Sequence, residues 1–334
     1  MPLFKSIEDL KSVVGAVNLN NSETKMEPFV EAALDEFVAP IISRELVDHL
    51  IETYMDADDS NEVRNKAILM LQKSAANLSY MLLASDGGIE VTDQGMFSPE
   101  DSAVKSAWQW QTMDFRKARE QQGFSALRNL YLFLEKKTIE PFLQDYLDSP
   151  ERTRMNSFFI QDDQTFNSFV SISGFQTWLS LRSFQTKIQA ETLKEILTED
   201  LYNELAAISK VNLTEEKELI TICQRVVASG TILAAIPLLP FKFSNDGLIV
   251  SEFVGNKDNA KQETQAIERT RNLQASCSVE FAKAKEDLVK YLDKNASISQ
   301  YESYYTEVVV PRIETETSLS QLREKRKEGG VKLI

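Results

Sequence analysis

Hydrophobic residues recur every three or four positions along most of this chain, a spacing typical of helices that bury one face. In the first half, residues 26–42 carry such a stripe, and it continues from Leu46 to Tyr54. Ser43 lies between the two segments, where a hydroxyl can cap the second helix. Residues 62–83 repeat the pattern over a longer range. The pattern therefore predicts two helices followed by a longer one.

A short segment near residues 86–97 interrupts this pattern. Ser85-Asp86-Gly87-Gly88 is a turn signal, and Ile89 and Val91 alternate with polar residues as in a strand. We expect Gly95-Met96-Phe97 to return as the second strand of a β-hairpin.

A long helical pattern follows this hairpin. Ser98-Pro99-Glu100 has the composition of a helix start, with proline at the first position. The pattern runs to about Leu147, with an interruption expected near Gly123. Asp148-Ser149-Pro150 is predicted to end it.

The second half presents the same order of elements. Asn245-Asp246-Gly247 is a hairpin turn signal inside a second expected hairpin near residues 241–253. The helices expected around it cover residues 169–188, 191–205, 214–237 and 257–293.

Landmarks of the two halves can be superposed, which indicates an internal repeat. At one constant offset, four apolar residues of the first half fall on four of the second: Phe37, Ile41, Leu46 and Leu50 on Phe184, Ile188, Leu193 and Leu197. Three further matches follow: Ala67–Ser74 on Thr221–Ala228 after a small insertion, Gly88–Val91 on Gly247–Val250, and Leu130, Phe133 and Leu134 on Leu288, Tyr291 and Leu292. The alternative is that any two amphipathic helices can be slid into partial register. The common order of elements favours the repeat.

The predicted fold is therefore mainly α, with two tandem duplicated helical-bundle modules that each carry a small β-hairpin. The first module covers residues 1–150 and its second copy residues 151–310. Residues 311–334 form a C-terminal arm.

The arm admits two interpretations. Val308–Pro311 is predicted to be extended, Thr315–Arg326 has helical composition, and Val331 and Leu333 make the end apolar. A frayed, solvated terminus is one interpretation. The other is a docking arm that becomes ordered on a partner, for which an apolar end after two glycines suits strand addition to a neighbour's sheet.

Composition agrees with a helical, soluble chain. Of its 334 residues, 43% are hydrophobic and 26% charged, with 11 glycines and 9 prolines, too few for a fold with many tight turns. The net charge of −14 disfavours a dedicated nucleic-acid surface, although acidic walls suit a channel through which DNA slides. The most apolar stretch, Val226–Phe241, is interrupted by Pro237 and Pro240, and we expect no membrane span.

Residues that carry chemistry are sparse. Cys223 and Cys277 fit neither a disulfide framework nor a zinc site, and His49, the one histidine, lies among core positions of a helix. The acidic cluster at Asp56–Ser60 lacks the glycine and the glutamate of a calcium loop. Asp162 and Asp163 fit a solvated helix end. We therefore expect no catalytic residues, no metal and no cofactor, and no enzyme.

Candidate interface residues come instead from apolar and basic positions. Trp108 and Trp110 stand two apart on one helix and cannot both face one core stripe unless the helix is covered on two sides. The strands and the arm supply the others. The full set is Trp108, Trp110, Ile89, Val91, Leu248, Val250, Arg323, Arg326, Val331 and Leu333.

Several of these landmarks carry a resemblance to a known group of proteins. The start from Leu3 to Leu10, Phe37-Val38-Ala39-Pro40-Ile41-Ile42 and Ser85-Asp86-Gly87-Gly88-Ile89 are its best local features. With them, most of the chain resembles uncharacterised proteins encoded beside the portal gene in tailed phages and prophages of Bacteroidetes, including crAss-like phages. These proteins are similar to head-to-tail connector proteins.

The resemblance implies a virion structural protein, a subunit of an adaptor ring below the portal. Its implied partners are the portal protein, neighbouring connector and tail proteins, and further copies of itself. DNA would be passing cargo, and the protein would lie in the virion neck after assembly in the host cytoplasm. The alternative is a non-viral cytosolic helical adaptor or scaffold without catalysis.

Overall fold

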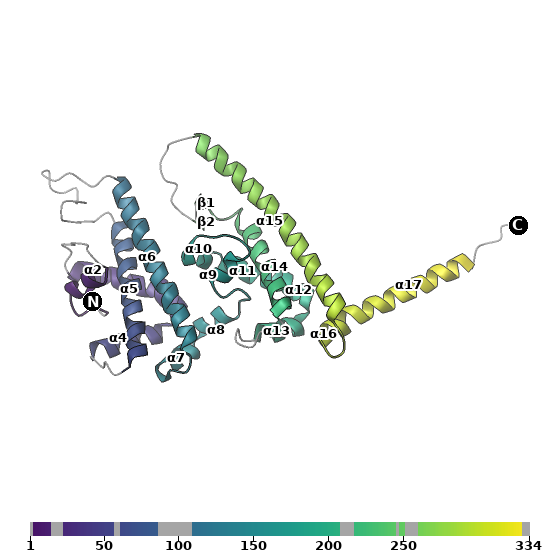
Figure 1. Cartoon of the computed structure of the whole chain (residues 1–334), viewed down its shortest axis with the longest axis horizontal. Coiled ribbons are helices and arrows are strands. Elements are labelled where there is room, and N and C mark those ends of the chain that lie inside the picture. Colours follow the sequence, from purple (N-terminus) through teal and green to yellow (C-terminus); the bar gives the residue numbers. More distant parts are fainter. Residues whose placement is uncertain are drawn as a thin grey trace. The chain divides into compact units, whose positions relative to one another are not determined.

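The chain is mainly α-helical, as predicted (Figure 1). The computed structural model describes residues 3–14, 23–56, 61–85, 109–207, 217–244, 247–250 and 260–328. Contacts divide the chain into two compact units. Unit 1 is Met1–Asn156 with Gly174–Gln176, and unit 2 is Ser157–Ser173 with Thr177–Ile334.

Unit 1 is built on a pair of long helices, α5 and α6. In chain order its helices are α1 (Ile7–Val14), α2 (Glu23–Ala33), the π-helix η1 (Leu34–Val38), α3 (Ala39–Ile42), α4 (Arg44–Met55), α5 (Glu62–Ser85), α6 (Gln109–Lys136), the 3₁₀-helix η2 (Pro141–Leu143), α7 (Gln144–Leu147) and α8 (Pro150–Asn156).

Helix α5 is the centre of the unit 1 core. It packs along α6 and also contacts α1, α2 and α4. From Ser74 to Met81 every side chain is buried, because neighbours cover the helix on several sides. The hydrophobic stripe predicted for residues 62–83 is therefore broader in the structure than one face.

Gly123 does not interrupt α6, contrary to the sequence-based expectation. It instead allows α6 to approach α5 closely, since a Cβ atom at this position would lie 2.7 Å from Cγ of Leu78. The Ser74 hydroxyl donates to the Gly123 carbonyl oxygen at 3.2 Å. A glycine that resembled a helix breaker is thus a packing contact.

Unit 2 also contains two long helices, α14 and α15. Its elements are α9 (Asp163–Asn167), most of α10 (Gly174–Ser180), α11 (Arg182–Ile188), the π-helix η3 (Gln189–Leu193), α12 (Lys194–Leu197), α13 (Glu199–Ala207), α14 (Lys217–Ala235), β1 (Phe241–Ser244), β2 (Gly247–Val250), α15 (Ala260–Asn295), α16 (Glu302–Tyr304), the π-helix η5 (Tyr305–Val309) and α17 (Val310–Glu328).

Helix α14 is the buried helix of this unit. It contacts α15 and α11, and Gly230 lies so close to them that a Cβ atom would be 2.6 Å from the Phe281 ring and 3.1 Å from Ile188. By length and composition α14 could also cross a bilayer, but 61% of its most apolar window is buried inside the protein. A core helix of this kind meets the same criteria, so α14 is weak evidence for a membrane span.

The same run of elements occurs in both units. In each, a five-residue π-helix leads into a four-residue α-helix, which ends at a residue with positive φ: Ser43 (φ 72°) in unit 1 and Thr198 (φ 67°) in unit 2. A helix follows directly, and then a long helix that starts at Glu62 in unit 1 and Lys217 in unit 2. All these equivalent positions are 155 residues apart.

This register corrects the one expected from the sequence. The structure pairs Val38, Ile42, Leu46 and Leu50 with Leu193, Leu197, Leu201 and Leu205, all of them buried. Pairing Leu46 with Leu193 was therefore eight residues out of register. A stripe with one apolar residue every four positions matches itself again when it is shifted by eight residues. The spacing of apolar residues alone therefore could not distinguish the two registers. The insertion expected before the long helix is not needed.

Several expected element ends also differ. The long helix of unit 1 ends at Lys136 rather than Leu147. A helix does end at Leu147 as expected, but it is the short α7, with Asp148 as its C-cap. Ser149 and Pro150 then start α8, whose Arg152 amide donates to the Ser149 hydroxyl at 3.2 Å. Residues 308–311 are not extended, because they complete η5 and begin α17.

The second half shows two more differences. The helix expected over residues 169–188 begins only at Gly174, and the one expected over residues 191–205 is divided at Thr198. The hairpin near residues 241–253 is present as β1 and β2, which pair antiparallel. The hairpin predicted near residues 86–97 lies outside the described residues.

Candidate functional site

Of the ten candidate interface residues, five belong to described elements and five do not. Ile89, Val91, Trp108, Val331 and Leu333 fall outside the described residues. The backbones of the others belong to named elements: Trp110 in α6, Leu248 and Val250 in β2, and Arg323 and Arg326 in α17. Among these five, the structure describes the side chain of Leu248 alone.

Leu248 is a core residue rather than an exposed interface residue. Its side chain is 4% exposed. Its backbone forms a parallel bridge to Ile172, with the Leu248 amide donating to the Ser171 carbonyl at 3.1 Å and the Leu248 carbonyl accepting from the Ser173 amide at 2.7 Å. These two hydrogen bonds therefore hold strand β2 against residues 171–173 of the same unit. Alternation in sequence identified the strand but could not identify which face was covered.

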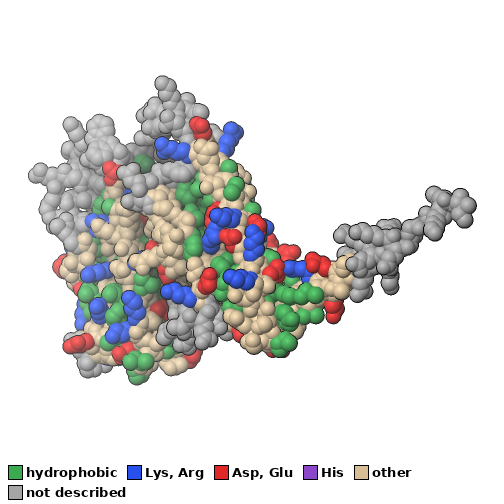
Figure 2. Space-filling model, turned by 45° about the vertical axis from the view of Figure 1, so that its right-hand side comes forward, with side chains coloured by type: hydrophobic (Ala, Val, Ile, Leu, Met, Phe, Trp, Pro, Cys, Tyr) green, Lys and Arg blue, Asp and Glu red, His purple; other side chains and the backbone are tan. Residues whose placement is uncertain are grey.

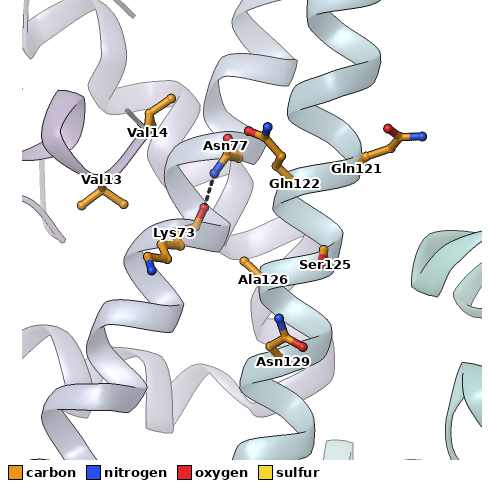
Figure 3. Close-up of a pocket in the computed structure, with 9 residues that line it drawn as sticks. All are labelled: Val13, Val14, Lys73, Asn77, Gln121, Gln122, Ser125, Ala126 and Asn129. Carbon is orange, nitrogen blue, oxygen red and sulfur yellow. Dashed lines mark hydrogen bonds between the residues drawn. The ribbon is translucent and has the colours of Figure 1, made fainter. Parts of the chain in front are cut away.

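An open groove of about 530 Å³ lies in unit 1 between α1, α5 and α6 (Figure 3). Its lining is mostly amide and aliphatic: Val13, Val14, Lys73, Asn77, Gln121, Gln122, Ser125, Ala126 and Asn129. No sequence pattern predicted this groove, because its residues come from three helices, α1, α5 and α6, and α1 is far from the other two in the chain.

Arg119 fixes the side chains beside this groove. It donates to the Val14 carbonyl at 3.3 Å, to Oδ1 of Asn77 at 3.1 Å and to Oε1 of Gln122 at 3.1 Å. Burial lowers the pKa of Arg119 from its usual value. The arrangement ties α1, α5 and α6 together and presents amide groups that can exchange hydrogen bonds with a polar ligand or a peptide backbone.

A three-residue cluster, the unit 1 latch, joins the end of α6 to the helices after it. Tyr146 Oη donates to Oε1 of Glu135 at 2.6 Å, and Arg152 Nε lies 3.1 Å from the same oxygen. The Glu135 and Arg152 side chains are 22% and 24% exposed. Burial and the charge of Glu135 raise the pKa of Tyr146 well above its usual value.

The same constellation, the unit 2 latch, stands at the end of α15. Tyr304 Oη donates to Oδ1 of Asp293 at 3.0 Å, and Nη1 of Arg312 lies 2.7 Å from Oδ2 of Asp293. Tyrosine and carboxylate are eleven residues apart in both latches. Sequence reasoning missed both, although this shared spacing was a usable signal.

The residues considered for metal chemistry are separate in the described part of the chain. No group of three or more His, Cys, Asp or Glu side chains there could hold a metal ion. Asp162 caps α9, accepting from the Thr165 amide at 2.7 Å. Cys223 and Cys277 are buried free thiols, and burial raises the pKa of both.

The described side chains of helix α17 are exposed after Val310. Every side chain from Pro311 to Ser318 is exposed, including Ile313 at 54%. Figure 1 shows α17 leaving the end of α15 as a separate helix. A helical segment whose described side chains are exposed gains little stability from packing within its own unit, and this is typical of a segment that packs against a partner.

Comparison with known proteins gives one family. A model described as a family of unknown function (DUF6712) matches two regions of the chain, residues 38–154 and 193–307. These regions begin at Val38 and Leu193, the two positions that the structure makes equivalent. No curated protein and no solved structure matches the chain.

Proposed function

We propose that this chain, which belongs to DUF6712, a family of unknown function, is a non-catalytic structural subunit that assembles through its helical units and its C-terminal arm. We further propose that the assembly is the head-to-tail connector of a tailed phage. In that role the chain forms a homo-oligomeric ring below the portal, and DNA passes through without specific binding.

The exposed helix α17 is the observation that carries this proposal. Its described side chains after Val310 are exposed although it spans 19 residues. Ordering such a segment costs conformational entropy that packing within its own unit does not offset. A contact with another molecule offsets it, as in arms that hold oligomers together.

The shared element order of the two helical units supports the same proposal. The family model matches twice, and the element order from the π-helix to the long helix is shared at a spacing of 155 residues. A subunit with two similar helical units can present similar surfaces twice, which suits a closed ring. The acidic net charge of −14 suits a channel for DNA.

The phage setting rests on the resemblance of the chain to proteins encoded beside portal genes. The test mixes the purified chain with the portal protein of the same genome and images both samples by negative stain. The proposal expects rings, or a portal carrying an additional collar of density. A chain that leaves portal particles unchanged in outline and mass would overturn the phage role.

The groove of unit 1 favours a second candidate, a cytosolic adaptor that binds a partner segment. Its amides and Lys73 suit a polar peptide. Capture of one host protein that is lost in Lys73→Glu, with no effect of the portal, would favour this function. Substitution of the exposed Lys66 to Glu is the matched control, since it makes the same charge change on α5 and Lys66 is not among the groove residues.

A further inference from the structure

The junction of η5 and α17 exposes apolar side chains. Tyr305, Val309 and Ile313 recur every four residues, which places them on one side of the helix; we call them the elbow stripe. Tyr305 and Val309 are half-buried, and Ile313 is 54% exposed. Figure 2 shows hydrophobic side chains gathered at the base of the arm.

Acidic residues surround the elbow stripe in sequence. Glu302, Glu307, Glu314 and Glu316 are all exposed. Arg312, the one basic residue of the segment 302–318, already pairs with Asp293. The surface around the elbow stripe is therefore apolar at its centre and negatively charged at its margin.

The C-terminal end of the chain has the complementary composition. Arg323, Lys325, Arg326 and Lys327 make the last turns of α17 basic, and Gly329-Gly330-Val331-Lys332-Leu333-Ile334 then ends the chain with three apolar residues. An apolar segment preceded by basic residues matches an apolar surface edged by carboxylates.

The geometry of α17 keeps residues 329–334 from packing along the elbow stripe of their own chain, because even Ile313 lies fifteen residues, or about 22 Å along the helix, before Glu328. Nineteen residues separate Val309 from Glu328, which is about 28 Å along an α-helix at its usual rise. The six residues after Glu328 span at most about 20 Å when fully extended. The centre of the stripe is therefore accessible to the end of a different copy.

We propose that the elbow stripe is the docking site for residues 329–334 of a second copy of this chain, with the basic end of α17 facing the exposed carboxylates. This inference rests on the proposed function and names the contact that joins its subunits. Each copy offers one elbow stripe and one C-terminal end. The contact joins two different surfaces, so it propagates head to tail and closes into a ring where the rotation permits.

Two variants of the full chain test the proposal. One ends after Glu328 and lacks the docking segment, while the other carries Ile313→Glu at the exposed position of the elbow stripe. Leu238→Glu is the matched control, because Leu238 is also in unit 2 and is 73% exposed. Circular dichroism and thermal unfolding establish that each variant is folded, and the truncation keeps all described elements.

The measurement is mass by light scattering, for each variant alone and for the two variants mixed. The wild-type chain and Leu238→Glu are expected to assemble, and each of the two test variants to stay a single chain. Their mixture is expected to form pairs and nothing larger, because one intact end meets one intact elbow stripe. A truncated chain that assembles like the wild type, or a mixture that does not pair, would overturn the proposal.

A second readout separates this inference from the proposed function. A labelled peptide of residues 319–334 is titrated against the truncated chain, with and without Ile313→Glu, and at least tenfold weaker binding is expected for the substituted chain. Equal binding would overturn the inference even if rings form with the portal. Elbow-dependent binding without any ring or portal complex would instead overturn the proposed function and keep the inference.

Discussion

At the scale of single residues, the two latches show that similar side chains contribute differently to stability when their burial differs. Glu135 and Arg152 are about a quarter exposed or less, whereas Asp293 and Arg312 are 35% and 45% exposed. A charged hydrogen bond shielded from water contributes more than an exposed ion pair, which contributes up to about 1 kcal/mol. The residue types alone could not have shown which latch contributes more to the free energy of unfolding.

Glu135→Gln is expected to lower the free energy of unfolding by about 2 kcal/mol, because Arg152 and Tyr146 lose a charged acceptor. Asp293→Asn, the matched change in unit 2, is expected to cost less than about 1 kcal/mol. Urea unfolding followed by circular dichroism measures both. An equal or inverted order would contradict the account of the latches.

The two cysteines are expected to resist alkylation in the folded protein. Burial raises the pKa of Cys223 and of Cys277, so at pH 8 the thiolate fraction is smaller than in an unfolded chain. Intact mass after iodoacetamide treatment should show no label in buffer and two labels in urea. Because the unfolded thiols ionise first, stability should fall as pH rises above about 8.5. Labelling in buffer would contradict the buried placement.

At the scale of elements, sequence periodicity was informative about helices and uninformative about their junctions. The helices over residues 26–42 and 62–83 and the hairpin at Asn245-Asp246-Gly247 were predicted because their signals are local. The π-helices, the continuity of α6 through Gly123 and the groove were not, because each depends on contacts between helices that are distant in sequence.

The junction residues Ser43 and Thr198 give an element-scale prediction. Both have positive φ, which is strained for residues other than glycine. The Ser43 hydroxyl compensates by accepting from the Leu46 amide at 3.2 Å, whereas Oγ1 of Thr198 is buried without a hydrogen-bond partner.

Thr198→Gly is therefore expected to raise the free energy of unfolding by about 1 kcal/mol, since it removes strain and a buried unpaired hydroxyl. Ser43→Gly, its equivalent in unit 1, is expected to change stability by less than about 0.5 kcal/mol, because the lost cap offsets the relieved strain. Thermal unfolding of the two variants measures the difference. A loss of stability in Thr198→Gly would show that the junction is not strained.

At the scale of the whole molecule, the chain consists of two similar helical units and one exposed arm. The order of elements was readable from the sequence, but the register between the units required the positions of the π-helices and of the residues with positive φ. Candidate partner surfaces were the hardest feature to predict. Apolar residues such as Leu248 serve the core as often as an interface.

We propose that this chain is an assembling structural subunit, and the mass of the particles that it forms is the decisive measurement. Light scattering would be measured for the chain alone over a range of concentrations and then with the portal protein of its genome. We expect the chain alone to have a defined multiple of the single-chain mass, or the portal to gain such a multiple in mass when the chain is added. A single chain at every concentration, with no mass added to the portal, would contradict it.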